Sequence, residues 1–143
     1  ATSSSTDFTT GKFQPVLDDP AVASGSGIQK VLLVAGKIYY DLKSEIEKRG
    51  ITGIALVRLE QYYPFPAADL QAIAAKYSGA QFVWVQDEPE NQGAWPFMVM
   101  EAQAAGLPAL SVVSRPRSAS PATGSSKRSQ VEAQLILDRA LSS

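Results

Sequence analysis

The chain has 143 residues, of which 45% are apolar and 19% are charged, so it can bury one hydrophobic core of ordinary domain size. Its net charge of −1 provides no basic field for nucleic acid or for an anionic membrane surface. Because the sequence contains no Cys and no His, it excludes disulfides, thiolate or imidazole metal sites and Ser-His-Asp catalysis within this chain.

The first 27 residues predict a flexible lead-in or linker, ahead of one α/β domain over residues 28–143. Residues 1–12 are rich in Ser and Thr and nearly lack large apolar side chains. The segment 13–19 is a candidate for a short edge strand, and the SGSG run at 24–27 is typical of a flexible hinge.

Strand-like runs alternate with helix-like segments through the rest of the chain. The runs are short and rich in β-branched residues, whereas the segments between them show the helical spacing of apolar side chains. The expected strands cover 30–35, 53–60, 81–85 and 110–115, and the expected helices cover 37–49, 66–77, 94–105 and 127–141, with a loop over 116–126. This alternation predicts an α/β fold, a three-layer α/β/α sandwich around a mainly parallel sheet.

The tract 86–95, QDEPENQGAW, is the most informative stretch of the sequence. It crowds three acids, two Gln, an Asn, a Pro, a Gly and a Trp into ten positions directly after the apolar run 81–85. Polar groups at the carboxyl end of a buried strand are where α/β proteins place binding and contact residues. Because the loops after parallel strands gather at one edge of the sheet, we expect this tract beside Gly36 and the turn at 61–66.

Two pairs of alternatives stay open within this tract. The carboxylates of Asp87, Glu88 and Glu90 could form an acid–base pair or a metal site, but solvated turn charges near a helix start are the favoured interpretation. Gly93 permits a positive φ or a close backbone approach. Trp95 is either a flat interface anchor or a core side chain beneath the loop.

Three cations lie near the ends of predicted strands. Lys37 follows Gly36 at a helix start, where free N–H groups suit a phosphate, although no G-x-G-x-x-G fingerprint is present. Arg58 interrupts an apolar strand and needs either an acidic partner, such as Glu60 or Glu88, or an anionic ligand, and the ion pair is favoured. The candidate anion-binding set is Lys37, Arg58 and Arg115.

Four motifs in order resemble one known family. They are GKIYYDL at 36–42, VRLEQYYPFP at 57–66, QDEPENQGAW at 86–95 and SRPRSASPATGSSKRSQ at 114–130. Together they resemble the C-terminal domain of the E1 component of 2-oxoglutarate dehydrogenase, a thiamine-diphosphate decarboxylase, from about residue 13 to about residue 141. The resemblance implies a fold like that of the C-terminal domain of transketolase.

The resemblance also implies a role without chemistry of its own. It places thiamine diphosphate and Mg²⁺ in the preceding domains of a longer E1 chain, so we expect no catalytic, cofactor-binding or metal-binding residue here. It implies a structural, dimer-forming and regulatory part, whose partners are those preceding domains, a second E1 chain and the E2 succinyltransferase. The interface candidates are Tyr62, Glu88, Asn91, Gln92, Gly93 and Trp95. The compartment expected by resemblance is the bacterial cytoplasm or the mitochondrial matrix.

Two functions of other classes stay open beside this one. The first is a stand-alone module that binds a nucleotide or acyl-CoA at the carboxyl edge of the sheet, through Lys37, Arg58 and Arg115. The second is an independent enzyme that uses Asp87 and Glu88, which the lack of His, Cys and any cofactor fingerprint disfavours.

Overall fold

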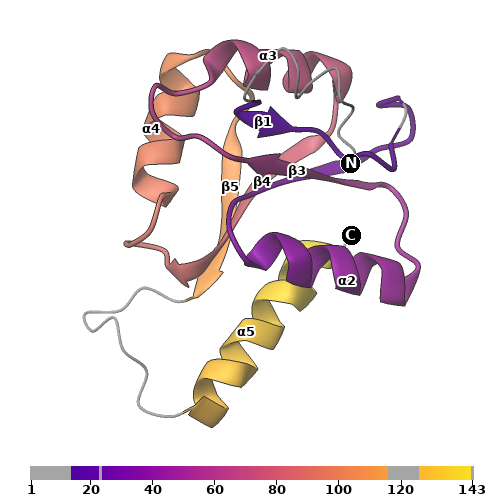
Figure 1. The fold of residues 1–143 in the computed structure, drawn as a ribbon, viewed down its shortest axis with the longest axis vertical. Helices are drawn as coiled ribbons and strands as arrows, with labels where there is room; N and C mark the ends of the chain where they lie inside the picture. Colours follow the sequence, from indigo (N-terminus) through magenta and orange to yellow (C-terminus); the bar gives the residue numbers. More distant parts are fainter. Residues whose placement is uncertain (1–13, 23, 116–125, 143) are drawn as a thin grey trace, which may run out of the picture.

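A computed structural model describes residues 14–22, 24–115 and 126–142 (Figure 1). The predictions of a lead-in over residues 1–12 and of a loop over residues 116–126 fall almost wholly outside these ranges. The elements are β1 (Val16–Leu17), β2 (Lys30–Val34), α2 (Ile38–Arg49), β3 (Ile54–Leu59), α3 (Ala67–Lys76), β4 (Gln81–Pro89), α4 (Trp95–Ala104), β5 (Leu110–Arg115) and α5 (Ser126–Leu141).

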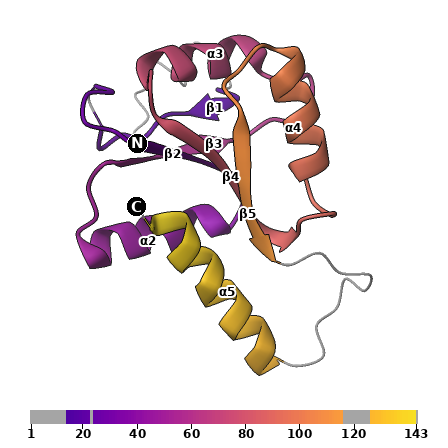
Figure 2. The same ribbon diagram turned by 180° about the vertical axis from the view of Figure 1, so that it is seen from behind.

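In the described part of the chain, the strands form one sheet in the order β1-β3-β2-β4-β5. Strands β2 to β5 run parallel, and β1 pairs antiparallel with β3 at one edge. Helices α2 and α5 cover one face of the sheet, and α3 and α4 cover the other (Figures 1 and 2). The predicted three-layer α/β/α architecture with a mainly parallel sheet is therefore confirmed.

Strand β2 shows why the sheet is buried on both faces. Val31 and Leu33 pack into the core beneath α3 and α4, whereas Leu32 and Val34 pack into the core beneath α2 and α5. All four side chains are at most 3% exposed. A strand covered on both faces needs apolar residues at every position, and this explains the unbroken apolar run.

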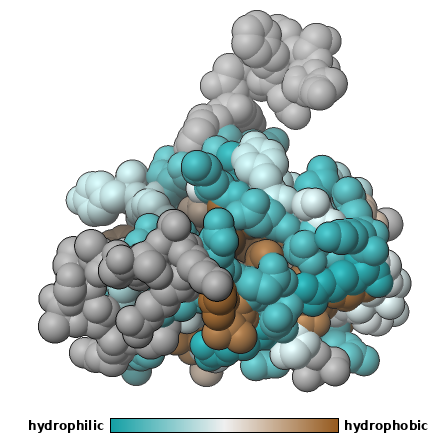
Figure 3. All heavy atoms as spheres, turned by 90° about the horizontal axis from the view of Figure 1, so that it is seen from below, coloured by the Kyte–Doolittle hydropathy of each residue, from teal (hydrophilic) through white to brown (hydrophobic). Residues whose placement is uncertain are grey.

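Helix α2 carries mainly polar residues on its outer side, whereas α4 exposes Val99 and Met100 and α5 exposes Val131 and Leu135. Helix α2 buries Ile38 and Leu42 and ends at Gly50, which has a left-handed φ of 63° that closes the helix. Figure 3, seen from below, shows a mainly hydrophilic surface with apolar patches between the polar side chains. Within the described ranges, no helix is both long enough and apolar enough to cross a bilayer.

Strand β4 is longer than the sequence pattern predicts. The expected strand ended at residue 85, but β4 continues to Pro89, which pairs with Arg115 of β5 after a shift in register beyond Val85. The first part of the polar tract is therefore strand and not loop. The prediction failed because period and hydrophobicity indicate burial, whereas this extension is held by side-chain hydrogen bonds described below.

The segment before β2 is tied to the body of the domain. Its edge strand, expected within 13–19, is present as β1. The Asp19 carboxylate accepts a hydrogen bond from the Leu56 N–H at 2.9 Å, and the Asp18 carboxylate accepts one from the Tyr77 hydroxyl at 2.6 Å. Gly25 passes so close to the Lys76 carbonyl oxygen that an added Cβ would lie 1.9 Å from it. Residues placed by the sequence in a lead-in thus contact the domain, and the boundary at residue 27 stays a prediction.

The Asp18 carboxylate also pairs with Lys76 at 2.5 Å. Burial would raise the pKa of Asp18, but the Lys76 ammonium, the Tyr77 hydroxyl and the Asp19 N–H outweigh burial and lower this pKa below its ordinary value of 3.8. Burial, together with the nearby Asp18 carboxylate, raises the pKa of the Tyr77 hydroxyl. The ionised carboxylate is therefore the form that the folded chain prefers.

We expect Asp18→Asn to lower the free energy of unfolding at neutral pH by about 1 kcal/mol, because a partly exposed charged contact is lost. Since folding lowers this pKa, the contribution of Asp18 is complete above pH 3.8 and disappears as the pH falls through the lowered value. Urea unfolding from pH 7 to pH 2.5 should show the difference between wild type and variant shrinking at the acid end. Glu47→Gln, at an exposed position of α2, is the control; a difference that stays constant down to pH 2.5 would contradict the assignment.

Candidate functional site

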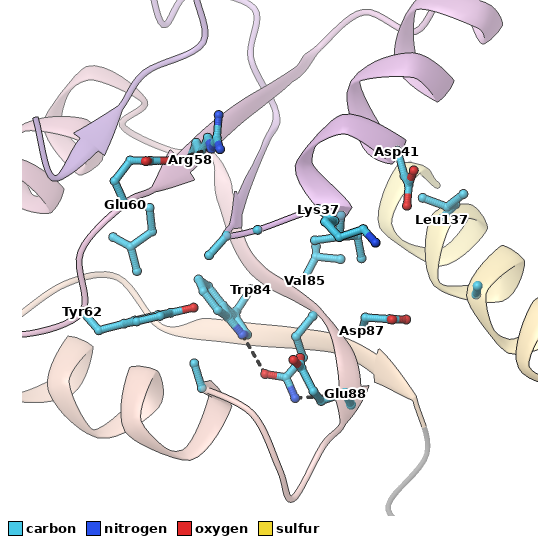
Figure 4. A pocket seen from close by; sticks show the side chains of 17 residues that line it. Lys37, Asp41, Arg58, Glu60, Tyr62, Trp84, Val85, Asp87, Glu88 and Leu137 are labelled. Carbon is cyan, nitrogen blue, oxygen red and sulfur yellow. Dashed lines mark hydrogen bonds and ion pairs between the residues drawn. The ribbon is translucent and has the colours of Figure 1, made fainter. Parts of the chain in front are cut away.

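An open cleft of about 780 Å³ lies at the carboxyl edge of the sheet (Figure 4). The central strand β2 lies between β3 and β4. The chain continues from β2 toward β3 and from β4 toward β5, so the loops after β2 and β4 run in opposite directions at this edge. This switch in strand order is where open α/β sheets bind ligands or contact partners. The lining residues are Ala35, Gly36, Lys37, Ile38, Asp41, Arg58, Leu59, Glu60, Tyr62, Trp84, Val85, Gln86, Asp87, Glu88, Ala94, Ala133 and Leu137.

The cleft brings together the segments that the sequence predicted to meet. Gly36 follows β2, Tyr62 belongs to the turn after β3, and Glu88 lies on the extended end of β4. Gly36 has a φ of 76°, which lets the chain turn sharply from β2 into α2. Placement of the 86–95 tract beside Gly36 and the 61–66 turn is therefore confirmed.

Gln86 organises the tract from inside. Its side chain is 3% exposed, and its Oε1 accepts hydrogen bonds from Trp84 Nε1 at 2.9 Å and from the Trp95 N–H at 3.0 Å. Its Nε2 donates to the carbonyl oxygens of Pro89 and Gln92, each at 2.8 Å. One amide thus joins the core, the end of β4, the turn and the start of α4.

Sequence reasoning did not single out Gln86. The sequence feature that could have identified Gln86 is its place two positions after Trp84, because residues two apart in a strand point to the same face. A buried amide requires partners for its oxygen and its NH₂ group, and a turn returning onto it can supply them.

Gly93 lets the tract fold back onto β4. Its φ is 67°, and a Cβ added there would lie 3.0 Å from Glu88 Oε1 and 3.2 Å from Gln86 Oε1. The position therefore combines a left-handed backbone with little room for a side chain. Glycine fixes the path of the chain between β4 and α4.

Arg58 is held by neighbours within the domain. Its guanidinium carbon lies 5.0 Å from the ring centre of Tyr39 and 5.1 Å from that of Tyr40, and Nη1 donates to the Tyr40 hydroxyl at 3.0 Å. Its Nε lies 2.5 Å from Glu60 Oε2, within ion-pair distance, although the N–H direction makes no hydrogen bond to any described residue. The predicted ion pair with Glu60 is confirmed.

Arg115 does not join Lys37 and Arg58 in the cleft. Its Nε donates to the Asp87 carbonyl oxygen at 2.8 Å, and Nη2 donates to the Asp87 carboxylate at 3.0 Å. Nη1 donates to Glu132 of α5 at 2.9 Å. Arg115 thus fastens β5 to the end of β4 and to α5, and of the three cations predicted to bind an anion, only Lys37 and Arg58 line the cleft.

The interface candidates fall into two groups. Tyr62 and Glu88 line the cleft, and Tyr62 is 39% exposed, edge-on to Trp84 with ring centres 6.3 Å apart. Burial, with a smaller contribution from the Glu88 carboxylate, raises the pKa of the Tyr62 hydroxyl. The remaining candidates, Asn91, Gln92, Gly93 and Trp95, lie on the returning part of the tract.

For Trp95 the structure supports the core alternative in part, and the interface alternative stays a prediction. Trp95 is the first residue of α4, is partly buried and packs against the core cluster that contains Trp84. Part of the indole therefore belongs to the core while part remains at the surface. Among the described residues, no three Asp, Glu, His or Cys side chains converge to hold a metal ion.

Comparisons with known proteins agree with this fold. The family described as 2-oxoglutarate dehydrogenase C-terminal matches residues 2–141. A multifunctional 2-oxoglutarate metabolism enzyme of Mycolicibacterium vanbaalenii is 40% identical over 94% of this chain, which spans 11% of that enzyme. A 2-oxoglutarate dehydrogenase E1/E2 component of Corynebacterium glutamicum is 42% identical over 98% of this chain and 12% of its own length. The E1 component of Cupriavidus necator is 38% identical, with 98% and 15% covered.

A solved structure has a similar fold. A split-gene transketolase, described as an inactive beta4 tetramer, superposes with a TM-score of 0.56 at 15% identity, covering 91% of this chain and 44% of that chain. At this identity the likeness concerns the fold alone. The prediction of a transketolase-like architecture is confirmed, and this chain spans less than a sixth of each of the curated relatives above.

We expect Gln86→Leu to destabilise the domain by roughly 3 kcal/mol, because it leaves Trp84 Nε1 and several backbone groups buried without partners. Urea unfolding followed by tryptophan fluorescence measures the loss. Gln103→Leu makes the same change at an exposed position of α4 and should leave stability within about 0.5 kcal/mol. Equal effects of the two substitutions would show that Gln86 has no special role.

Gly93→Ala should destabilise the domain more than Gly106→Ala. Both glycines have positive φ, 67° and 74°, so both variants bear backbone strain of about 1 kcal/mol. Only at Gly93 would the new Cβ meet other atoms, whereas the space at Gly106 is open. Thermal unfolding of the two variants separates strain from contact, and equal melting temperatures would refute the close packing of Gly93 on Glu88.

Proposed function

The chain belongs to the family of 2-oxoglutarate dehydrogenase C-terminal domains, and on that premise we propose that it serves a longer E1 enzyme as a structural and dimer-forming part. The reaction of the parent enzyme is then the oxidative decarboxylation of 2-oxoglutarate. The domain itself supplies contact surface and no reacting group. Its partners in this proposal are the preceding domains of the same chain, a second E1 chain and the E2 succinyltransferase.

The observation that carries the proposal is the construction of the 86–95 tract. Gln86 and Gly93 hold it rigidly from within, while Tyr62 and Glu88 face the cleft and Trp95 stays partly exposed. A rigid polar loop with partly exposed aromatic groups is typical of a surface prepared for a partner, because little conformational entropy is lost when it docks.

The described residues do not fit thiamine diphosphate and its Mg²⁺. In the part of the chain that the structure describes, no three carboxylates converge to hold a metal, and the guanidinium groups of Arg58 and Arg115 are engaged by Glu60 and Asp87. We propose that the preceding domains of the parent enzyme hold the cofactor.

A nucleotide or acyl-CoA effector site at Lys37, Arg58 and Arg115 stays a prediction. The contacts do not favour it, since Arg115 lies outside the cleft lining and Arg58 already pairs with Glu60. The Lys37 ammonium forms no ion pair or hydrogen bond with another described residue and would be the main cation of such a site. The stand-alone ligand-binding module therefore ranks behind the structural role.

We expect the purified 143-residue chain to turn over no 2-oxoglutarate in the presence of thiamine diphosphate and Mg²⁺, while the parent enzyme does.

In the parent, Trp95→Ala should weaken association of the chains by about 2 kcal/mol if this indole is an interface anchor. Sedimentation equilibrium of the parent measures this change.

Tyr63→Ala in the parent is the matched control, because Tyr63 is an aromatic residue of the neighbouring turn that is 85% exposed and is not an interface candidate. Turnover by the isolated chain above a heat-treated sample would overturn the structural role. Association unchanged by Trp95→Ala, together with a lowered melting temperature, would make Trp95 a core residue only.

A further inference from the structure

Among the described residues, more acids than bases line the cleft. Its charged lining residues are the carboxylates of Asp41, Glu60, Asp87 and Glu88 and the cations Lys37 and Arg58. Two of the acids already have partners within the domain, since Glu60 pairs with Arg58 and Asp87 pairs with Arg115. Two carboxylates and one ammonium therefore remain without an ion pair or side-chain hydrogen bond among the described residues.

Lys37 and Asp41 carry opposite charges and are close in sequence. They stand four residues apart at the start of α2, the spacing at which side chains on a helix become neighbours. Figure 4 shows both on the α2 side of the cleft, with Glu88 across from them near Trp84. No ion pair joins Lys37 and Asp41 among the described residues, and of the two unpaired carboxylates Glu88 is the one that belongs to the 86–95 tract.

Glu88 is held in place although its carboxylate forms no ion pair or hydrogen bond with another described residue. Its Cβ and Oε1 lie 3.1 Å and 3.0 Å from where a Cβ of Gly93 would be, so the returning tract confines the side chain. Its backbone belongs to the β4 extension that Gln86 and Arg115 secure. Tyr62 and Trp84 line the same cleft and offer aromatic surface nearby.

From this charge imbalance we infer that the surface covering the cleft in the parent enzyme places an arginine or lysine side chain beside Glu88. The inference rests on the proposed function, in which the 86–95 tract docks on the rest of that enzyme. Docking removes Glu88 from water, and an ionised carboxylate buried without a counter-ion is strongly unfavourable. A basic side chain answers this requirement, and its cation can also lie against the aromatic rings of the cleft.

Amide hydrogen exchange of the parent enzyme tests both the docking of the 86–95 tract and the presence of a cation beside Glu88. In the wild type, residues 86–95 should exchange more slowly than in the 143-residue chain, which reports docking. In the parent, Glu88→Gln should accelerate exchange over 86–95 by at least about tenfold and leave β2 unchanged. Raising the salt concentration should accelerate exchange of this tract in the wild type but not in Glu88→Gln.

Glu47→Gln removes an exposed acid of α2 and is the matched control, with exchange expected to equal that of the wild type. If the tract is protected in the parent and Glu88→Gln changes nothing, the cation is refuted and docking stands. Slower exchange in Glu88→Leu would show an apolar partner surface and also refute the cation. If the tract exchanges equally fast in the parent and in the isolated chain, the docking role and the inference fail together.

Discussion

The candidate site depends on the buried amide of Gln86. Its oxygen binds the indole N–H of Trp84 in the core and the backbone N–H that begins α4, and its NH₂ group binds carbonyl oxygens of the intervening turn. Hydrophobic packing alone could not specify the path of a segment as polar as 86–95, because such a segment has little apolar surface to bury. A fully satisfied amide instead gives that segment one conformation.

Charge is arranged in the domain so that most cations near the cleft stabilise the fold. Arg58 lies between two tyrosines beside Glu60, and Arg115 connects β4, β5 and α5. Lys30 acts similarly at the opposite edge of the sheet, where its ammonium donates to the carbonyl oxygens of Ala140 and Ser142 at the end of α5. Arg58 and Arg115, which the sequence offered as ligand contacts, thus have ion-pair partners within the domain.

The sequence predicted the layers well and the details of the site only in part. Short, β-branched apolar runs such as 31–34 favour strands buried on both faces, and Gly50 marks the end of α2 through its left-handed backbone. The chain order then places the 86–95 tract, Gly36 and Tyr62 at one edge. Hydrophobic pattern encodes these features, since it reports which positions face away from water.

Other features depend on contacts that no local pattern encodes. Asp18 meets Tyr77 across 59 residues, and Gln86 becomes a centre only because the tract returns onto it. The extension of β4 and the loss of Arg115 from the predicted anion-binding set have the same cause. A polar side chain has several potential partners, and the tertiary path of the chain decides among them.

The strand order has a consequence for synthesis on the ribosome. Strands β1, β2 and β3 are complete once residue 59 has emerged, but the second neighbour of β2 is β4, which begins at residue 81. During that interval the most apolar strand of the domain presents an unpaired edge, the kind of surface at which nascent chains associate wrongly. Translation speed between residues 59 and 89 is thus a variable that this topology makes relevant to the yield of folded protein.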